Sequence, residues 1–518
     1  MKIKLVSFED VPYEKKLGRD IIVDGFKYRN PGFTYFLSHY HADHYQGITG
    51  KTWDVGVIYC GPITASLLIN VMQVPAQYVK ALEPDIPHPL PNDQGTVTLM
   101  DANHCPGANV MLFELKDGRN YLHVGDFRYD STLPYRSPGW KRVSAVQIDE
   151  LFLDTTYCRP KHTFPKQDVV VSEIGRLVSE YVKADAQTND KTLFVIATYT
   201  IGKEKVLHEI AKTLKCKVFV TKEKLDILKL LDLEYIDIFT LDPRSSQVNI
   251  VSWNQIGEMA PGGWRFLPNW DYCQQYYDWH NSLHPDSPYT RLIGLVPTGW
   301  TWELSKTLSP SSLYTRSYKE PFTIHQIPYS EHSSFEELRD CVKYVRPARV
   351  VPTVLGSKAA TIEGYFKDLV DTKRAKQKGF QSLFGSSSSV IRSSSPVIAT
   401  NVEDDADDEP TVLEVEEETP ITSIAVIPTQ QNQAENAVSC PCCNKVVPEK
   451  DINAHLDSCL NNKLDTIEPS SSAPKVIDKR KHAEPIDNQS ATKRKKTNVP
   501  KGQTTLSSFF SSPPKSQK

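Results

Sequence analysis

The sequence feature that most constrains the fold is a run of metal-binding side chains directly after a β-prone segment. Residues 33–37 (FTYFL) are apolar and predict a buried strand. The pattern H-x-H-x-D-H follows, formed by His39, His41, Asp43 and His44. A loop at a strand end can point several side chains inward while the sheet fixes its root. Because imidazole and carboxylate are ligands of catalytic zinc sites, we interpret this loop as part of a metal centre, not as a polar loop that happens to be rich in His.

Three later strand ends supply further side chains of the same kinds. His104 follows a predicted strand and begins a Gly/Pro turn, Asp126 follows a strand and a glycine, and His332 comes after an apolar segment near residue 324. A single His or Asp at a strand end is usually a cap or turn residue. Four strand ends that each present such ligands predict one shared metal centre.

Composition divides the chain of 518 residues into two unlike parts. Residues 1–372 alternate apolar runs with turn and helix signals, which is typical of an α/β fold. From residue 373 onward, Lys, Ser and acidic clusters predict a disordered tail. The net charge of −3 leaves no global basic field, so a nucleic-acid surface would be local. Without an evident signal peptide, membrane span or disulfide framework, we expect a soluble protein in a reducing compartment.

The motifs resemble those of the metallo-β-lactamase fold and its β-CASP subgroup. The first pattern matches motif 2, His104 motif 3, Asp126 motif 4, Asp154 motif A and His332 motif B. The phrases DTTYC, TYTIGKE, PTGW and SEHSS resemble the DNA cross-link repair nucleases of the SNM/PSO type. RNA-cleaving β-CASP nucleases carry a His at motif C, whereas this chain has Val at 350 and 351. That departure also favours the DNA-acting branch.

The resemblance implies a metallo-β-lactamase αβ/βα sandwich with an inserted β-CASP domain. Residues 1–160 would form the first part of the sandwich, 161–310 the insertion, and 311–372 the completion. Within the insertion, apolar spacing predicts a helix over 168–184, a buried strand over 191–197 and a new helix from 202–204. The tail would divide into a linker (373–436), a zinc finger (437–462) and a terminal segment (463–518).

The implied activity is 5′→3′ exonuclease cleavage of DNA in interstrand cross-link repair. A divalent metal lowers the pKa of its bound water to about 7 and so supplies hydroxide at neutral pH. His39, His41, His104 and Asp126 would hold one metal. Asp43, His44 and His332 would hold a second, or orient water and substrate. We expect one or two Zn²⁺ ions, exchangeable with Mg²⁺. The residues given catalytic roles are Asp43, Asp126, Asp154 and His332.

Asp154 and a set of small polar residues have two interpretations each. Asp154 would hydrogen-bond a ligand imidazole, or would serve as an ordinary helix or turn cap. Ser333 and Ser334 would bind a substrate 5′-phosphate at a helix start, or would simply cap that helix. Thr200 and Lys203 lie at a second predicted helix start. The resemblance favours a phosphate pocket formed by all four residues.

A second metal-binding pattern lies in the tail. Cys440 and Cys443 have C-x2-C spacing, and His455 and Cys459 lie one helical turn apart. Two thiolates on a knuckle plus His and Cys on a helix predict a closed structural zinc site. The segment resembles the UBZ-type ubiquitin-binding fingers, in which an acid at the position of Asp457 contacts ubiquitin.

The last part of the tail carries patterns that resemble a nuclear import signal and protein-binding motifs. Basic clusters at 479–481 and 493–496 resemble a bipartite nuclear import signal. The segment 503–510 matches the PCNA-interacting box, with its defined positions at Gln503, Leu506, Phe509 and Phe510. Residues 412–415 followed by three Glu resemble a SUMO-binding strand. These patterns predict a nuclear protein that binds DNA with a 5′-phosphate, PCNA and ubiquitin or ubiquitylated PCNA.

Three other functions are compatible with parts of this evidence. The first is a structure-selective DNA endonuclease of the Artemis type, working in end joining, which the PCNA box and the finger disfavour. The second is an inactive scaffold, which the filled ligand positions disfavour. The third is a small-molecule hydrolase such as a lactamase, which the β-CASP motifs and the nuclear signals disfavour.

Overall fold

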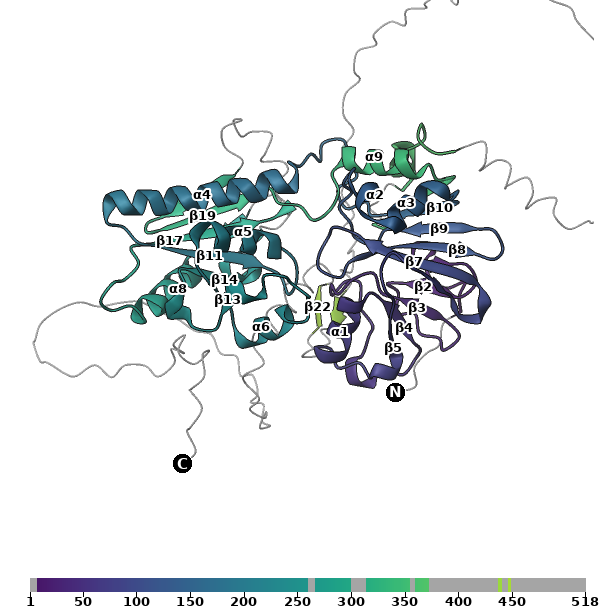
Figure 1. Cartoon of the computed structure of the whole chain (residues 1–518), viewed down its shortest axis with the longest axis horizontal. Coiled ribbons are helices and arrows are strands. Elements are labelled where there is room, and N and C mark those ends of the chain that lie inside the picture. The colour runs from purple at the N-terminus through teal and green to yellow at the C-terminus, as the bar shows by residue number, and fades with distance from the viewer. Residues whose placement is uncertain are drawn as a thin grey trace, which may run out of the picture. The chain divides into compact units, whose positions relative to one another are not determined.

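The computed structural model describes residues 7–259, 266–299, 314–354 and 359–371, and two short strands at 437–439 and 446–448. The described part is an α/β structure with several sheets, as the sequence predicts (Figure 1). No helix in the described ranges combines the length and apolar composition that a membrane crossing requires.

The first sheet has the strand order β1-β2-β3-β4-β5 and positions the H-x-H-x-D-H loop. Its strands are β1 (Lys16–Leu17), β2 (Ile21–Val23), β3 (Thr34–Phe36), β4 (Ile58–Cys60) and β5 (Val79–Ala81). β1 and β2 are antiparallel, and the other pairs are parallel. Helix α1 (Pro62–Asn70) joins β4 to β5. The strand predicted over 33–37 is therefore confirmed as β3, with all three of its residues buried.

The second sheet has the order β20-β10-β9-β8-β7-β6. Its strands are β6 (Pro87–Pro89), β7 (Gly95–Asp101), β8 (Asn109–Leu115), β9 (Asn120–His123), β10 (Glu150–Leu153) and β20 (Arg349–Pro352). β20 pairs in parallel with β10, with Leu151 opposite Val350. The chain therefore leaves this sheet after β10 and returns to it some 200 residues later.

The two sheets pack face to face through a shared apolar layer. Ile21, Val23 and Phe36 of the first sheet join Leu99 and Phe113 of the second in one buried cluster. The rings of Phe36 and Phe113 meet edge to face, with centroids 5.1 Å apart. Besides α1, the helices α2 (Leu133–Arg136), α3 (Pro138–Ala145), α9 (Phe335–Val345) and α10 (Ala359–Gly364) accompany this sandwich.

The segment between β10 and β20 forms a sheet of its own, with the order β13-β12-β14-β11-β17-β19-β18. Its strands are β11 (Thr192–Thr198), β12 (Val218–Phe219), β13 (Phe239–Thr240), β14 (Val248–Ser252), β17 (Arg291–Pro297), β18 (Thr315–Lys319) and β19 (Phe322–Ile327). A separate hairpin joins β15 (Gly257–Met259) to β16 (Phe266–Pro268). All neighbouring pairs of the seven-stranded sheet are parallel except β18 with β19. The inserted domain was expected to end at residue 310, but this sheet continues to Ile327 because β19 pairs with β17 and β18 pairs with β19.

Helices cover both faces of the seven-stranded sheet. Its strand β11 is therefore buried along its whole length. Phe194 and Ile196 face α4 (Gln167–Thr188) and α5 (Glu204–Leu214) in one cluster. Leu193 and Val195 point to the opposite side, in a cluster with α7 (Trp253–Ile256) and α8 (Trp270–Ser282). Figure 1 shows α4 and α8 on opposite sides of this sheet, and α6 (Lys222–Leu228) follows β12. The helices predicted over 168–184 and from 202–204 are thus confirmed as α4 and α5.

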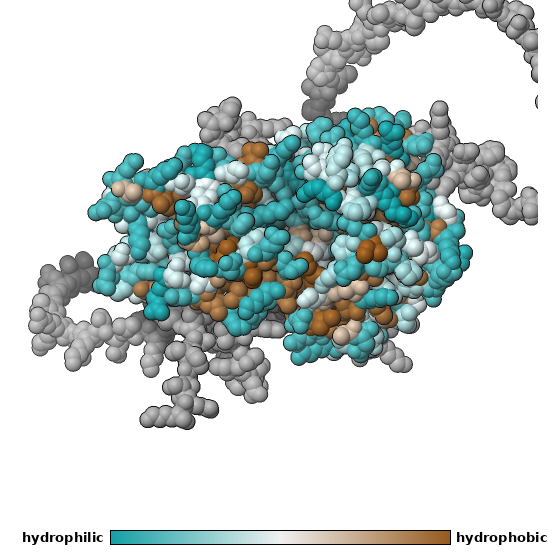
Figure 2. All heavy atoms as spheres, viewed as in Figure 1, coloured by the Kyte–Doolittle hydropathy of each residue, from teal (hydrophilic) through white to brown (hydrophobic). Residues whose placement is uncertain are grey.

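The surface carries large apolar side chains only as scattered individuals among the described residues. The most exposed are Tyr135 in α2, Tyr318 in β18 and Ile86 just before β6. The face shown in Figure 2 is mostly hydrophilic, with hydrophobic areas interrupted by polar side chains.

In the tail, the structure describes the antiparallel strands β21 (Ala437–Ser439) and β22 (Val446–Pro448), with Ala437 opposite Pro448. The predicted finger ligands Cys440, Cys443, His455 and Cys459, together with Asp457, lie outside the described residues. The basic clusters, the SUMO-like strand and the PCNA box with Gln503, Leu506, Phe509 and Phe510 lie outside them as well.

Candidate metal centre

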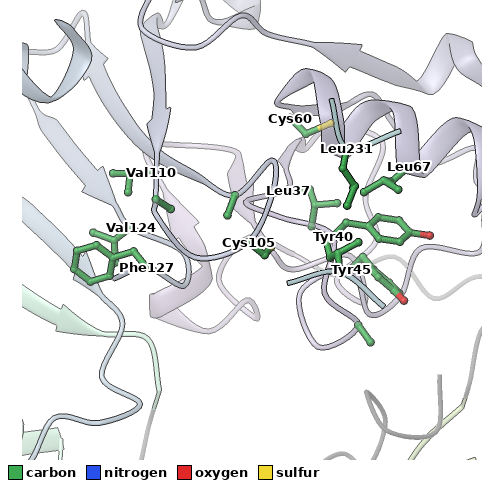
Figure 3. Packing of buried hydrophobic residues seen from close by; sticks show 14 of the residues in the cluster. Leu37, Tyr40, Tyr45, Cys60, Leu67, Cys105, Val110, Val124, Phe127 and Leu231 are labelled. Carbon is green, nitrogen blue, oxygen red and sulfur yellow. The ribbon is translucent and has the colours of Figure 1, made fainter. Parts of the chain in front are cut away.

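The loop after β3 is anchored by its apolar side chains. The backbone N–H groups of His44 and Tyr45 both donate to the carbonyl of His41, which closes a tight turn. Tyr40 and Tyr45 are buried with ring centroids 4.9 Å apart. In Figure 3 these two rings lie in the same packed group as Leu67 of α1 and Leu231, a residue of the inserted segment. The loop that carries the histidines is therefore anchored in the apolar core.

Three imidazoles from two loops converge on one point. His39 Nε2 lies 3.0 Å from His41 Nδ1, and His104 Nε2 lies 3.2 Å from the same atom. Asp126 Oδ2 lies 3.9 Å from His39 Nε2 and 3.8 Å from His104 Nε2. Ligand atoms about 2.0–2.1 Å from a tetrahedral zinc ion lie about 3.3 Å from one another. The spacing and the donor types therefore fit a divalent metal ion held at the centre of this group.

A second group shares Asp126 with the first. His44 Nε2 lies 3.2 Å from Asp126 Oδ2. His332 forms a candidate ligand group with His104 and Asp126, whose ligand atoms all lie within 4.8 Å of one another. Asp43 Oδ2 lies 3.7 Å from His44 Nε2, and its side chain is 47% exposed. This exposure places Asp43 at the open edge of the centre.

The imidazoles are oriented by hydrogen bonds from their outer nitrogens. Nδ1 of His104 donates to the carbonyl of Glu331 at 2.8 Å, and Nδ1 of His332 donates to the carboxylate of Asp154, also at 2.8 Å. Nδ1 of His44 donates to Asp24 at 2.7 Å. Because these acceptors carry no proton, each Nδ1 must carry one, and Nε2 is left free to bind a metal. The hydrogen bond expected of Asp154 is present.

His39 is oriented through an intermediate. The Ser38 hydroxyl donates to the carboxylate of Asp24 at 2.6 Å and therefore accepts from Nδ1 of His39 at 2.9 Å. Asp24, Ser38 and Glu331 were not among the residues predicted to form the site. Asp24 and His44 are 20 residues apart, and only the pairing of β2 with β3 brings them together. Spacing within a motif carries no signal for such a contact.

Charge divides the centre into neutral bases and charged groups. Burial lowers the pKa of His39 well below its usual value, lowers that of His41 to about 4, and lowers that of His104. These three imidazoles are therefore neutral at pH 7, with lone pairs free for a metal. Burial opposes ionisation of Asp126, but His44 and His332 hold the pKa of its carboxyl well below the usual range.

The other two imidazoles have raised pKa values in the absence of a metal. Burial lowers the pKa of His332, but Asp154 and Asp126 outweigh it and raise the value to about 9. For His44 burial is likewise outweighed, chiefly by Asp126 and Asp43, and the pKa is well above its usual value. His39, His41, His104 and Asp126 thus offer three neutral bases and one carboxylate, a donor set typical of zinc. The imidazoles of the second group, His44 and His332, have raised pKa values instead.

Cys105 lies closer to the centre than the sequence suggested. Its sulfur belongs to a candidate ligand group with His39, His41 and His104. Burial raises the pKa of this thiol well above its usual value, so it is protonated at neutral pH. In Figure 3 Cys105 lies within the packed apolar group, so its main contribution is packing.

The residues predicted to bind phosphate all have protein partners. Ser334 caps α9 in a capping box with Glu337. The Ser333 hydroxyl accepts from the backbone N–H of Tyr129 and donates to the carbonyl of Phe127, the residue after Asp126. Lys203 is buried, and its ammonium group lies 3.0 Å from the carboxylate of Glu331. Capping is therefore one role of Ser334, while phosphate binding by Thr200, Lys203, Ser333 and Ser334 stays a prediction.

Comparison with known proteins gives one family model and several relatives. Residues 234–358 match the model described as "DNA repair metallo-beta-lactamase". The chain is 37% identical over 355 residues to DNA ligase 6 of Arabidopsis thaliana, covering 67% of this chain and 24% of that protein. It is 34% identical over 356 residues to DNA cross-link repair protein SNM1 of the same plant, covering 68% of each. It is 33% identical over 341 residues to 5′ exonuclease Apollo of Gallus gallus, covering 65% of this chain and 63% of Apollo. The chain thus spans about a quarter of the first relative and about two thirds of the other two.

Proposed function

Since this chain belongs to the DNA cross-link repair metallo-β-lactamase family, a family of hydrolases that includes SNM1, PSO2 and the 5′ exonuclease Apollo, we propose that it is a metal-dependent 5′→3′ DNA exonuclease. The observation that carries the proposal is the convergence of His39, His41, His104 and Asp126 on one point. We further propose that the repair of interstrand cross-links is its setting.

Each residue of the centre then has a role. His39, His41, His104 and Asp126 would hold one metal, and Asp43, His44 and His332 would hold a second or orient the water and the scissile phosphate. When bound, a divalent metal makes hydroxide available at neutral pH and stabilises negative charge on a phosphodiester. Asp154 fixes the proton of His332 on Nδ1, so that Nε2 of His332 faces the reacting groups. With only one metal bound, a protonated His332 would instead attract the substrate phosphate.

A 5′-phosphate pocket is the second part of the proposal and would explain action at ends. Thr200, Lys203, Ser333 and Ser334 are its proposed residues. Two observations support the two serines: Ser333 bonds to the main chain on both sides of Arg128, close to Asp126, and Ser334 lies at the start of α9, where helix dipoles favour anions. Because the side chains of Lys203, Ser333 and Ser334 already have partners, a bound phosphate would have to share or replace them.

The tail modules form the third part. We propose that Cys440, Cys443, His455 and Cys459 bind a structural zinc, with Asp457 on ubiquitin. The pairing of β21 with β22 supports a knuckle, because the six residues between the two strands contain Cys440 and Cys443. We also propose nuclear import through the two basic clusters, and binding of PCNA through Gln503, Leu506, Phe509 and Phe510. Two weak modules on one tether would raise the local concentration of the nuclease at damaged forks.

The test of the central proposal uses the full chain and single-stranded DNA labelled at its 3′ end. Wild type is compared with Asp43→Ala and with Asp54→Ala, which removes an exposed acid outside the centre. The substrates carry a 5′-phosphate, a 5′-hydroxyl or a blocked 5′ end. We expect a ladder shortened from the 5′ end that requires the phosphate, persists in Asp54→Ala and is lost in Asp43→Ala. Internal cuts that ignore the 5′ group would instead indicate an endonuclease, and no cleavage with any divalent metal would contradict the proposal.

The partner proposals have a separate test. Binding of the full chain to the sliding clamp is measured with wild type and with Phe509→Ala/Phe510→Ala. Binding to ubiquitin is measured with wild type and with Asp457→Ala. We expect each substitution to abolish its own interaction and leave the other unchanged. Clamp binding that survives loss of both phenylalanines would exclude the box as the contact.

A further inference from the structure

We propose that Glu331 and Lys203 act together as positioning residues that hold His104 in place at the metal centre. The inference rests on the proposed function for its catalytic meaning, but its structural content concerns metal binding alone. It assigns to the inserted segment a direct part in shaping the metal site, because Lys203 lies between β11 and α5 and Glu331 follows β19.

Glu331 contacts a candidate metal ligand directly. Its backbone carbonyl accepts the hydrogen bond from Nδ1 of His104 at 2.8 Å. Glu331 is also the immediate neighbour of His332 in the chain. A shift of this backbone would therefore move the acceptor that fixes the proton of His104, and would move His332 with it.

The side chain of Glu331 is held by Lys203. Its carboxylate accepts from the backbone N–H of Lys203 at 2.9 Å and from the Lys203 ammonium group at 3.0 Å. The side chains of Lys203 and Glu331 are only 4% and 8% exposed. An ion pair without solvent is specific in its geometry, and removal of one partner leaves a buried charge without compensation. The pair therefore fixes the Glu331 backbone more firmly than a surface ion pair could.

The loop that carries Lys203 has two consecutive residues with positive φ angles. Lys203 has φ 69° and Gly202 has φ 107°, both in the left-handed region. A Cβ on Gly202 would lie 3.1 and 3.2 Å from the two carboxylate oxygens of Glu331, so a glycine permits the close approach. A strained backbone at a non-glycine residue persists only where the surroundings enforce it, and it is common at functional sites.

The loop that carries Lys203 also contacts a second imidazole, that of His41. The carbonyl of Ile201 lies 3.4 Å from Nε2 of His41, on the side away from the metal-facing Nδ1. The loop itself is held from behind, since the ammonium group of Lys224 donates to the carbonyls of Tyr199 and Thr200 at 2.7 and 2.8 Å. One loop of the inserted segment thus contacts two of the three neutral histidines, directly at His41 and through Glu331 at His104.

The experiment compares Glu331→Gln, Lys203→Met and their combination with wild type, all in the full chain. Glu331→Gln keeps the shape and an oxygen acceptor for the Lys203 amide but removes the charge. Gly202→Ala disturbs the same contact without removing a charge, and so serves if a charge variant is poorly folded. Asp185→Asn is the matched control, because Asp185 pairs with Arg291 in the same seven-stranded region, far along the chain from every candidate ligand. Zinc affinity is measured by competition with a chromophoric chelator, with Cys440→Ser/Cys443→Ser as the common background so that zinc taken up by the proposed tail finger is not counted, and unfolding is measured by urea titration.

We expect each charge variant and Gly202→Ala to weaken zinc binding by about 10- to 100-fold, the effect usual for outer contacts of metal ligands. The combination should be no worse than the single variants, because they remove one shared contact. Asp185→Asn should lower the urea midpoint and leave zinc affinity within about twofold of wild type. Unchanged zinc affinity in Glu331→Gln, Lys203→Met and Gly202→Ala, or an equal loss in Asp185→Asn, would overturn the proposal.

A second readout separates this inference from the phosphate pocket. Cleavage of 5′-phosphorylated and 5′-hydroxyl DNA is compared in each variant at saturating metal. A positioning role predicts the same ratio of the two rates as in wild type. If Lys203→Met removes the preference for 5′-phosphate while zinc affinity stays normal, Lys203 is a substrate ligand and the positioning role is wrong. If the wild type cleaves no DNA, the proposed function fails, while the zinc affinities still decide the present inference.

Discussion

The carboxylate of Asp24 accepts a hydrogen bond from Nδ1 of His44 at 2.7 Å, and it also holds the backbone N–H of Ser38 at 2.8 Å. Through the Ser38 hydroxyl the same carboxylate orients His39. Asp24 is 5% exposed and has φ 50°, a conformation that directs its side chain from the end of β2 toward the loop after β3. One buried acid therefore sets the orientation of two candidate ligands, one in each half of the centre.

Replacement of Asp24 by Asn should weaken metal binding by about 10- to 100-fold. The amide presents a donor as well as an acceptor, and it cannot satisfy His44 and both groups of Ser38 together. Zinc affinity by chelator competition measures the effect. Asp20→Asn is the control, since Asp20 bonds only to Gln94 among the contacts that the structure gives its side chain. Equal affinities for Asp24→Asn and wild type would show that this carboxylate does not orient the ligands.

Replacement of Asp154 by Asn should act on turnover. The amide can face His332 with either its oxygen or its NH₂ group, so the proton of His332 is no longer fixed on Nδ1. The raised pKa of His332 also depends on the Asp154 carboxylate. We expect kcat to fall by about 10- to 100-fold with KM for DNA nearly unchanged, measured under multiple-turnover conditions. A rise in KM at constant kcat would assign Asp154 to substrate binding.

Acid should destabilise the inserted segment independently of the metal centre. Burial, followed by the neighbouring His284, lowers the pKa of His280 to about 4, and its side chain is 0% exposed. In the unfolded chain, His280 has a pKa of about 6.5. Between pH 6.5 and the folded-state pKa of about 4, His280 is therefore protonated in the unfolded chain but not in the folded one. The free energy of unfolding then falls as the pH falls, by about 1.4 kcal/mol per pH unit.

The variant His280→Leu cannot bind that proton. Its stability should therefore fall less than that of wild type when urea unfolding is followed from pH 7 to pH 5. Parallel curves for His280→Leu and wild type would mean that His280 does not sense pH in this range.

Removal of the metal should lower the melting temperature of the full chain. A ligand that binds only the folded state stabilises it by about 2.7 kcal/mol at 100 times its Kd. Addition of a chelator to wild type should lower Tm, and added Zn²⁺ should restore it. His39→Ala loses a ligand at the centre, so its Tm should respond little to the zinc that this centre binds. The tail finger is a separate proposed zinc site, so Cys440→Ser/Cys443→Ser serves as background for both proteins.

The sequence predicted the first half of the metal centre because its ligands are adjacent in the chain. His39, His41 and His44 share one loop, and a single strand prediction places them. His104, Asp126 and His332 come from strand ends far apart in the sequence, so the pattern of ligands at strand ends suggested a shared centre and the family resemblance gave each residue its place in it. Asp24 and Glu331 could not be found in either way, because each acts through a contact that the fold alone creates.

The inserted segment also combines features that local sequence patterns predict with one that depends on contacts between distant residues. The strand over 191–197 and the helix over 168–184 follow from local apolar spacing, and both are present as β11 and α4. The end of the insertion depends on which sheet accepts β18 and β19. β19 pairs with β17, and β18 pairs with β19, so both strands join this sheet and not the sandwich through pairings that local sequence patterns do not contain.

The most direct test of the account is a metal titration of the full chain. The protein is made metal-free with a chelator, and Zn²⁺ or Mg²⁺ is added in steps while cleavage of 5′-phosphorylated DNA is followed in single turnover. Cys440→Ser/Cys443→Ser is used alongside wild type so that zinc taken up by the tail finger is not counted. The account predicts no cleavage without metal, recovery that saturates at one or two ions per chain, and no recovery in His39→Ala/His104→Ala. Cleavage by the metal-free protein, or equal recovery in that variant, would contradict it.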